Sequence, residues 1–350
     1  MTFPVDQAGA ARPLRVGISG YGLAGRVFHA PLLASCGFEV AGVVTNNPER
    51  QAQVRGDFPS AQVLGSIHDL VALNLDLVVV ASGNSAHASD AIAALESGAH
   101  VVVDKPMGRT VAEIKSILSV AQSHGRMAIP FFNRLWDSDA LTIKKIIDEK
   151  ILGNIFRMES RFERFRPGNT PKNWRESASL EEGGGNLLDL QPHLISTALD
   201  WFGPATLEYA SVRNIRKMSD DDVVLVLNHE NGVDSYLAAS AIIGAPGPRI
   251  RLSGDEGTLI IRDLDGQEDL LRSGKSPTHG IWNPPVRSKA EIHRGGEVVD
   301  YPSIGGEYGA FYAAVAAAIQ GAGKWPTTGE MALDVARIID QAKITSTRSL

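Results

Sequence analysis

The chain of 350 residues lacks several features that mark particular classes of protein. Its one cysteine, Cys36, excludes a disulfide framework and a cluster of cysteine metal ligands. No apolar run approaches the roughly 18 residues that a membrane-spanning helix needs. The chain has no excess of positive charge: 34 Lys and Arg residues stand against 40 Asp and Glu residues, and the formal net charge of −6 argues mildly against nucleic acid or an anionic membrane surface as partner. Residues 1–12 lack the apolar segment of a secretory signal, so we expect a flexible arm and a cytoplasmic protein.

The first part of the chain alternates short apolar runs with helical patterns. Strands are predicted at 14–20, 38–45, 75–82, 99–106 and 126–133, and helices at 24–36, 66–72, 86–97 and 111–124. Thr110 followed by Glu113 is a capping-box signature for the last of these helices. Strands that alternate with helices predict a parallel, doubly wound sheet.

The pattern changes near residue 133. A helix is predicted at 138–152, and five or six consecutive strands with one polar face, beginning at IFRMESRFERF, predict a largely antiparallel sheet. Further helices are predicted at about 185–201, 306–322 and 330–345, and the polar segment 264–300 is expected to be a long surface excursion. We therefore predict an arm (1–12), a dinucleotide-binding domain (13–132), a substrate and oligomerisation domain (133–328), and a C-terminal helix (329–350) that packs back on the first domain.

A glycine-rich loop follows the first predicted strand and opens a helix. The loop is Gly20-Tyr21-Gly22-Leu23-Ala24-Gly25, which has the G-x-G-x-x-G spacing. The first glycine permits a tight turn, the second a close approach to a pyrophosphate, and the third close packing of helix on strand. Free N–H groups and the dipole of the helix then favour phosphate. In this context the motif predicts a dinucleotide site.

The end of the second predicted strand bears on the choice of cofactor. A carboxylate there would bind the 2′-hydroxyl of NAD, but the segment begins Thr45-Asn46-Asn47. These neutral side chains, with Arg50 one turn further, could receive a 2′-phosphate. We therefore favour NADP. NAD stays open, because Glu49 could swing inward and Arg50 could be an ordinary solvated residue.

Two further segments lie at the ends of the predicted strands 75–82 and 99–106, where ligands of open α/β sheets bind. The first supplies Ser82, Asn84 and His87 as candidate cofactor contacts, although His87 could equally pack locally at the start of a helix. In the second, Asp104-Lys105-Pro106, the lysine could donate hydrogen bonds to a substrate oxygen beside the cofactor, and the X-Pro bond could be cis. A surface lysine at a turn is an equally good interpretation from position alone.

A carboxylate and a histidine interrupt an apolar surface at Asp189 and His193. Four residues apart, they share one face if the segment is a continuous helix. A nearby buried carboxylate raises the pKa of a histidine, which suits a general base or acid. The alternative is an Asp–His pair that closes a core. No third ligand has suitable spacing for zinc, so no metal is predicted.

Together these motifs resemble the Gfo/Idh/MocA oxidoreductases over about residues 13–348. The matching pieces are GYGLAG, HAPLL, ASGNSAHA, DKPMG, FFNRLWDSD and GGGNLLDLQPHLI. The resemblance implies a Rossmann domain, a C-terminal α/β domain with an open, mainly antiparallel sheet, and homodimers or homotetramers formed through that sheet. It also implies hydride transfer between NAD(P) and a sugar, polyol or inositol. FHAPLL and RFERFRP look most like the subgroup of NADP-preferring scyllo-inositol dehydrogenases.

The resemblance also implies roles for particular residues. Lys105, Asp189 and His193 match the catalytic positions, and Asn84 matches a contact to ribose or nicotinamide. Asp104 stands where glutamate is usual, which is expected to alter contacts to the cofactor, and Gln191-Pro192 replaces a pair that contains glycine. Candidates for the substrate pocket, each of which could instead be structural, are Asn133, Arg134, Arg164, Trp174 and Arg175.

Three functional hypotheses follow. The first is a metal-free NAD(P)-dependent dehydrogenase in which His193 exchanges the hydroxyl proton, Lys105 polarises the oxygen, and Asp189 orients the substrate and tunes His193. The second is a glycoside hydrolase that uses tightly held NAD for transient oxidation. The third is a nucleotide-binding sensor without catalysis, against which the presence of all three catalytic-type side chains argues.

Overall fold

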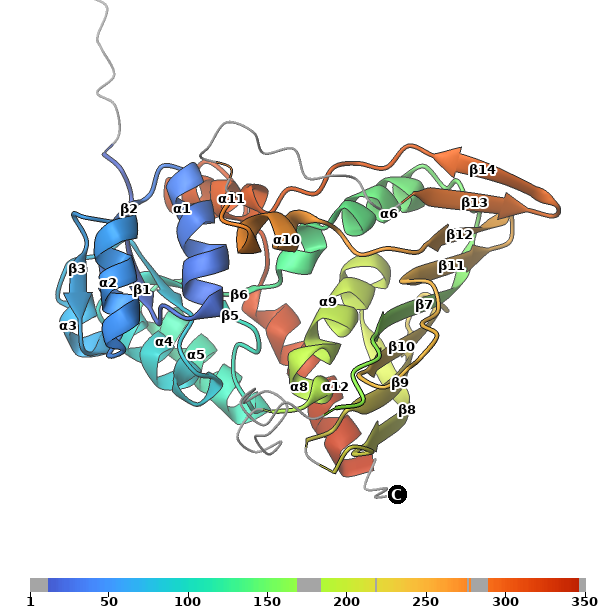
Figure 1. Ribbon diagram of the computed structural model, residues 1–350, viewed down its shortest axis with the longest axis horizontal. Helices are drawn as coiled ribbons and strands as arrows, with labels where there is room; N and C mark the ends of the chain where they lie inside the picture. Colours follow the sequence, from blue (N-terminus) through green and yellow to red (C-terminus); the bar gives the residue numbers. More distant parts are fainter. Residues whose placement is uncertain (1–11, 169–183, 218, 276, 278–288, 346–350) are drawn as a thin grey trace, which may run out of the picture.

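Two sheets organise the part of the chain that the computed structural model describes, which is residues 12–345 apart from 169–183, 218, 276 and 278–288. In Figure 1 a parallel sheet and its helices form one half of the molecule, and a second, larger sheet forms the wall of the other half. The predicted arm, residues 1–12, falls almost entirely outside the described residues.

The first sheet has the strand order β3-β2-β1-β4-β5-β6, and all its strands are parallel. Its strands are β1 (Arg15–Ser19), β2 (Glu39–Val44), β3 (Gln62–Leu64), β4 (Leu77–Val80), β5 (His100–Asp104) and β6 (Ala128–Phe131). The connecting helices are η1 (Leu23–His29), α1 (Ala30–Ser35), α2 (Pro48–Asp57), α3 (Ile67–Val71), η2 (Asn84–Ala86), α4 (His87–Glu96) and α5 (Val111–Ser123). The doubly wound parallel sheet is confirmed. Every residue of β4 is buried, as expected of a strand covered on both faces.

The second sheet has the order β14-β13-β12-β11-β7-β10-β9-β8 and is antiparallel except where β7 and β10 run parallel. Its strands are β7 (Ile155–Glu163), β8 (Ala205–Arg213), β9 (Asp222–His229), β10 (Asp234–Ser240), β11 (Ile250–Gly254), β12 (Gly257–Ile261), β13 (Ala290–Arg294) and β14 (Glu297–Tyr301). The helices that follow β6 in the sequence are η3 (Asn133–Trp136), α6 (Ser138–Asp148), α8 (Asn186–Asp189), α9 (Gln191–Phe202), α10 (Gln267–Arg272), α11 (Gly309–Ile319) and α12 (Gly329–Thr345). Of these, α11 packs on α1 and belongs to the core of the first half. A mainly antiparallel second sheet is confirmed.

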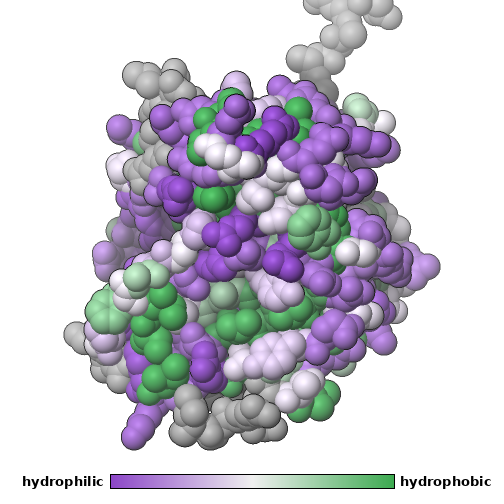
Figure 2. Space-filling model, turned by 90° about the vertical axis from the view of Figure 1, so that its right-hand side faces the viewer, coloured by the Kyte–Doolittle hydropathy of each residue, from purple (hydrophilic) through white to green (hydrophobic). Residues whose placement is uncertain are grey.

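The second sheet has one covered and one open face. Helix α9 packs on β7 and β10, and α12 packs on β8, so both lie on the inner face towards the first sheet. Among the described helices none covers the outer face (Figure 1), and Figure 2 looks onto that face, where apolar and polar side chains mix. Helix α12 also contacts α5 and β6, so it joins the two halves.

The helix predicted at 24–36 is present, as the π-helical η1 that continues directly into α1. Two other predictions about elements were wrong. The segment 264–300 is not one surface excursion, because it contains α10 and the hairpin of β13 and β14. The helix predicted at about 185–201 is interrupted at Leu190, between α8 and α9. Asp189 and His193 therefore do not lie on one face of a continuous helix.

Candidate active site

The glycine loop has the geometry that its spacing predicts. Gly20 has φ +96°, and a Cβ atom there would overlap the backbone of Ala81 at the end of the neighbouring strand. A Cβ atom on Gly25 would overlap the carbonyl oxygen of Gly20. A Cβ atom on Gly22 would meet only the Arg50 guanidinium, at 3.7 Å, so the backbone at Gly22 can be approached closely. The chain thus forms a glycine cradle at the start of η1 that fits a pyrophosphate.

A groove of about 800 Å³ extends from this cradle along the carboxyl ends of the parallel strands. The glycine loop from Gly20 to Ala24 lines it, and so do six of the predicted contacts: Thr45, Asn46, Arg50, Ser82, Asn84 and Asp104. Asp90, which sequence reasoning missed, accepts hydrogen bonds from the hydroxyls of Ser19 (2.8 Å) and Ser82 (2.9 Å) at the base of the groove. Asp90 lies on α4, whereas its two donors lie at the end of β1 and just after β4. The three residues come from separate elements, so no local motif indicated a role for Asp90 in the groove.

His87 lies outside the groove. Its side chain is buried, with Nδ1 2.8 Å from the Pro106 carbonyl oxygen and Nε2 3.1 Å from that of Ser82. The ring therefore braces the segments after β4 and β5 against each other. This position corresponds to local packing, the alternative interpretation left open for this residue.

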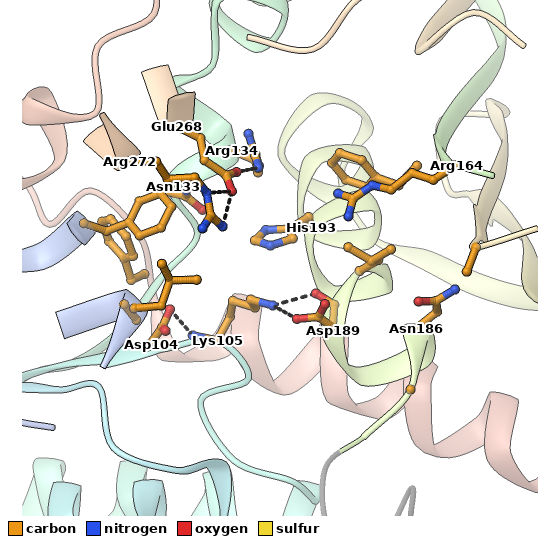
Figure 3. A pocket seen from close by; sticks show the side chains of 18 of the residues that line it. Asp104, Lys105, Asn133, Arg134, Arg164, Asn186, Asp189, His193, Glu268 and Arg272 are labelled. Atoms are coloured by element: carbon orange, nitrogen blue, oxygen red, sulfur yellow. Dashed lines mark hydrogen bonds and ion pairs between the residues drawn. The ribbon is translucent and has the colours of Figure 1, made fainter. Parts of the chain in front are cut away.

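Lys105 leaves the end of β5 and reaches the second half of the molecule. Its Nζ donates to Asp189 twice, to the carboxylate Oδ1 at 2.7 Å and to the main-chain oxygen at 2.6 Å (Figure 3). The Lys105-Pro106 bond is cis, as the sequence allowed. Asp104 accepts the backbone N–H of Lys105 on Oδ1 at 2.9 Å. The shorter carboxylate at position 104 thus has a structural partner in the next residue of the chain.

His193 differs from its expected electrostatic environment. Asp189 is paired with Lys105, and the pKa of His193 is held well below its usual value by burial and then by the positive charges of Lys105, Arg134 and Arg249. The expectation that Asp189 raises this pKa was therefore wrong. Within the described residues Nδ1 of His193 is buried without a hydrogen-bond partner. A second ring proton would have no acceptor there, so the neutral ring is favoured further.

A second cavity, of about 370 Å³, lies between the two halves and includes His193 (Figure 3). Five residues line both this cavity and the groove: Leu23, Ala24, Asp104, Lys105 and Asp189. The two spaces therefore meet at the Lys105–Asp189 pair. Of the predicted pocket residues, Asn133, Arg134 and Arg164 line the second cavity, whereas Trp174 and Arg175 lie outside the described residues.

Comparisons with known proteins agree with this architecture. A family model described as "Oxidoreductase family, NAD-binding Rossmann fold" matches residues 14–132, and the GFO/IDH/MocA C-terminal domain matches residues 140–260. A Bacillus subtilis protein named scyllo-inositol 2-dehydrogenase (NADP(+)) IolW is 33% identical over 340 residues, which are 94% of this chain and 92% of the relative. The chain belongs to the Gfo/Idh/MocA oxidoreductase family.

Two other relatives extend this result. The oxidoreductase YdgJ of Escherichia coli is 33% identical over 334 residues, 93% of this chain and 94% of the relative. A solved structure of the oxidoreductase yvaA from Bacillus subtilis superimposes with a TM-score of 0.86 at 32% identity and covers 95% of this chain and 96% of its own. In this oxidoreductase the groove along the first sheet is accordingly an NAD(P)-binding site of the Rossmann type.

Several cavity residues of this oxidoreductase were not predicted. Glu268 of α10 accepts from Arg134 and from Arg272 Nε at 2.8 Å, and Arg134 also donates to Tyr308 at 3.1 Å. Glu268 and Arg272 lie in the segment 264–300, which the sequence predicts as a surface excursion rather than as part of a site. His29, within the HAPLL motif, also lines the cavity, and burial lowers its pKa to about 4.

Among the described residues, no three or more His, Cys, Asp and Glu side chains gather as ligands for a metal ion. No described helix combines the length and apolar character needed to cross a membrane.

Proposed function

We propose that this oxidoreductase is an NADP-dependent dehydrogenase acting on a hydroxyl carbon of a polyol, sugar or inositol. The observation that carries the proposal is the meeting of the cofactor groove and the second cavity at Lys105 and Asp189, with His193 in the same cavity. Bound nicotinamide supplies a hydride acceptor or donor at this junction. Residues 13–132 would bind the cofactor and residues 133–328 most of the substrate.

The three side chains have separate roles in this proposal. His193 is neutral at rest, so it accepts the hydroxyl proton during oxidation and returns it during reduction. Lys105 has three N–H donors, of which two are directed to Asp189, so one is left to polarise the reacting oxygen. Asp189 is a positioning residue for the Lys105 ammonium group and orients neighbouring substrate hydroxyls.

The groove supports NADP over NAD. No carboxylate is found among the described residues that line the groove at the end of β2, which are Thr45, Asn46, Asn47 and Arg50. The nearby Glu49 is exposed and does not line the groove. The Arg50 guanidinium lies close to Gly22 of the cradle, within reach of a 2′-phosphate. The Bacillus subtilis relative, named as NADP-dependent, is consistent with this preference.

The test of the proposal is His193→Ala. Removal of the proton acceptor is expected to lower kcat by roughly 10²–10⁴-fold, with NADPH binding unchanged. Stopped-flow measurement of hydride transfer and fluorescence titration with NADPH separate these two effects. Normal turnover by the variant would remove His193 from the mechanism, and sugar release without NADPH accumulation would indicate the hydrolase reaction instead.

A further inference from the structure

The cavity that contains His193 holds an excess of positive side chains. Among its described lining residues, three are carboxylates: Asp104, Asp189 and Glu268. Six are cationic: Lys105, Arg134, Arg164, Arg166, Arg216 and Arg272. Charge of one sign in a cleft raises the local concentration of a ligand of the opposite sign.

The carboxylates are already engaged. Asp104 accepts the N–H of Lys105, and Asp189 accepts its ammonium group. Glu268 lies between two guanidinium groups and bonds both. None of these three carboxylates forms an ion pair with Arg164 or Arg166, although Asp189 and Glu268 act on Arg164 from a distance.

Two arginines of the cavity have no ion pair among the described residues. Arg134 and Arg272 share Glu268, and Arg216 pairs with Asp221 at 3.0 Å. By contrast, no described acceptor lies within hydrogen-bonding or ion-pair distance of the guanidinium groups of Arg164 and Arg166.

The backbone holds these two arginines in place. The N–H of Arg164 donates to the Ser240 carbonyl oxygen at 2.9 Å, and that of Arg166 donates to the Ala241 oxygen at 2.7 Å. The segment thereby extends β7 along the end of β10. Because side chains alternate in extended backbone, residues 164 and 166 share a side, and Phe165 between them points away.

Arg164 is directed at the reacting centre. In Figure 3 its guanidinium reaches back into the cavity, on the opposite side of His193 from Asn133. Partial burial lowers the pKa of Arg164, and the positive charge of Arg166 lowers it further, whereas the charges of Asp189 and Glu268 raise it. A bound anion would act in the same direction as these two carboxylates.

We propose, on the basis of the dehydrogenase function above, that the substrate carries an anionic group that binds to Arg164 and Arg166. Its hydroxyl carbon then lies at Lys105 and His193. The group is a carboxylate, as in a sugar acid, or a phosphate, as in a sugar phosphate, since the guanidinium fork matches either.

The experiment compares matched ligands on the full chain with NADP present. Glucose, glucuronate and glucose 6-phosphate differ mainly in charge, and scyllo-inositol is a further neutral ligand. Calorimetry and initial rates are expected to show at least about tenfold tighter binding of one anionic ligand than of its neutral partner, weakening as salt is raised. The preferred anionic ligand distinguishes the carboxylate from the phosphate.

Arg164→Gln and Arg166→Gln are the decisive variants. Each is expected to weaken anion binding by roughly 10- to 100-fold, as for loss of hydrogen bonds to a charged group, and to leave neutral ligands unaffected. Arg164→Lys, which keeps the charge, should recover part of the loss. Arg55→Gln, an exposed arginine of α2 that lines neither cavity, is the control and should change nothing.

The outcomes separate this inference from the function on which it rests. Equal binding of neutral and anionic ligands, or equal weakening of both in Arg164→Gln, would overturn the anionic substrate and leave the dehydrogenase intact. His193→Ala that binds the anion but does not oxidise it supports both. Anion binding that depends on Arg164, together with normal turnover in His193→Ala, would support the anion site and overturn the catalytic assignment.

Discussion

At the scale of single residues, the protonation state of His193 leads to a prediction about pH. Because burial and three nearby cations hold its pKa well below 6.5, the ring is neutral and able to accept a proton throughout the neutral range. As pH falls, kcat/KM for alcohol oxidation should therefore stay level through 6.5 and decline only below it. The pH profile of kcat/KM in the oxidative direction measures this. An acid limb centred at or above 6.5 would contradict the role of the buried neutral ring.

Arg50 provides the second residue-scale prediction. Arg50→Ser removes the cation that lies beside Gly22 and should raise the Kd for NADPH about tenfold or more, since a charge-assisted contact to the 2′-phosphate is lost. The Kd for NADH should not change. Fluorescence titration of both nucleotides gives the ratio. A parallel weakening of NADPH and NADH would show that Arg50 supports the groove in general.

The candidate residues were predictable to the extent that they end a strand or belong to a motif. Lys105 follows a buried strand, and its proximity to Asp189 confirms that the two segments meet. The pKa of His193 was not predictable, because it is lowered first by burial and then by the charges of Lys105, Arg134 and Arg249, all of which depend on the packing of distant parts of the chain. Asp104 has a structural explanation only once its hydrogen bond to the following N–H is seen.

At the scale of elements, the glycine loop allows a matched pair of substitutions. Gly25→Ala places a methyl group where the carbonyl oxygen of Gly20 lies, so the loop must open and dinucleotide affinity should fall at least about tenfold. Gly56→Ala in α2 is the control, because a Cβ atom there meets nothing within 4 Å. NADPH titration of the two variants is the measurement. Equal affinity in both would show that the third glycine is not required.

Elements with a strong local pattern were predicted, and those that depend on a partner were not. The continuous apolar runs of β4 and β5 and the Thr110 cap of α5 are local signals, and the Thr110 hydroxyl indeed accepts the Glu113 N–H at 3.1 Å. The strand β14, by contrast, is exposed along most of its length and is ordered by pairing with β13. The break at Leu190 likewise arises where α8 meets the second sheet, although Pro192 was a signal for a new helix start.

At the scale of the whole molecule, the site exists because two sheets from different parts of the chain are held together. Helix α12 packs on α5 and β6 of the first half and on α9 and β8 of the second. A residue pattern predicts each half separately. Lys105 belongs to the first half and Asp189 to the second, so the distance between them is set by how α12 packs the two halves together. It can therefore be known only from the assembled structure.

The open face of the second sheet carries a row of side chains across its strands. Tyr209, Val226 and Tyr236 lie opposite one another in register, followed by Glu159 and Arg251, which form an ion pair. Tyr209 and Tyr236 are 52% and 38% exposed. Aromatic residues with a polar surround are typical of protein interfaces. We therefore propose that two copies of the chain associate through this face.

Tyr236→Lys tests the proposed association. A lysine at the centre of the row would place like charges together across a two-fold contact, and roughly 2 kcal/mol or more of lost association would raise the dimer Kd at least about 30-fold. Analytical ultracentrifugation over a range of concentrations should show the wild-type protein as a dimer or larger and the variant shifted towards monomer. Ile344→Lys on α12, 81% exposed and away from the sheet face, is the matched control and should sediment as the wild type does. If Tyr236→Lys remains fully associated while it binds NADPH normally, the interface lies elsewhere on the molecule, because two lysines brought together across a two-fold contact would weaken an interface centred on this position.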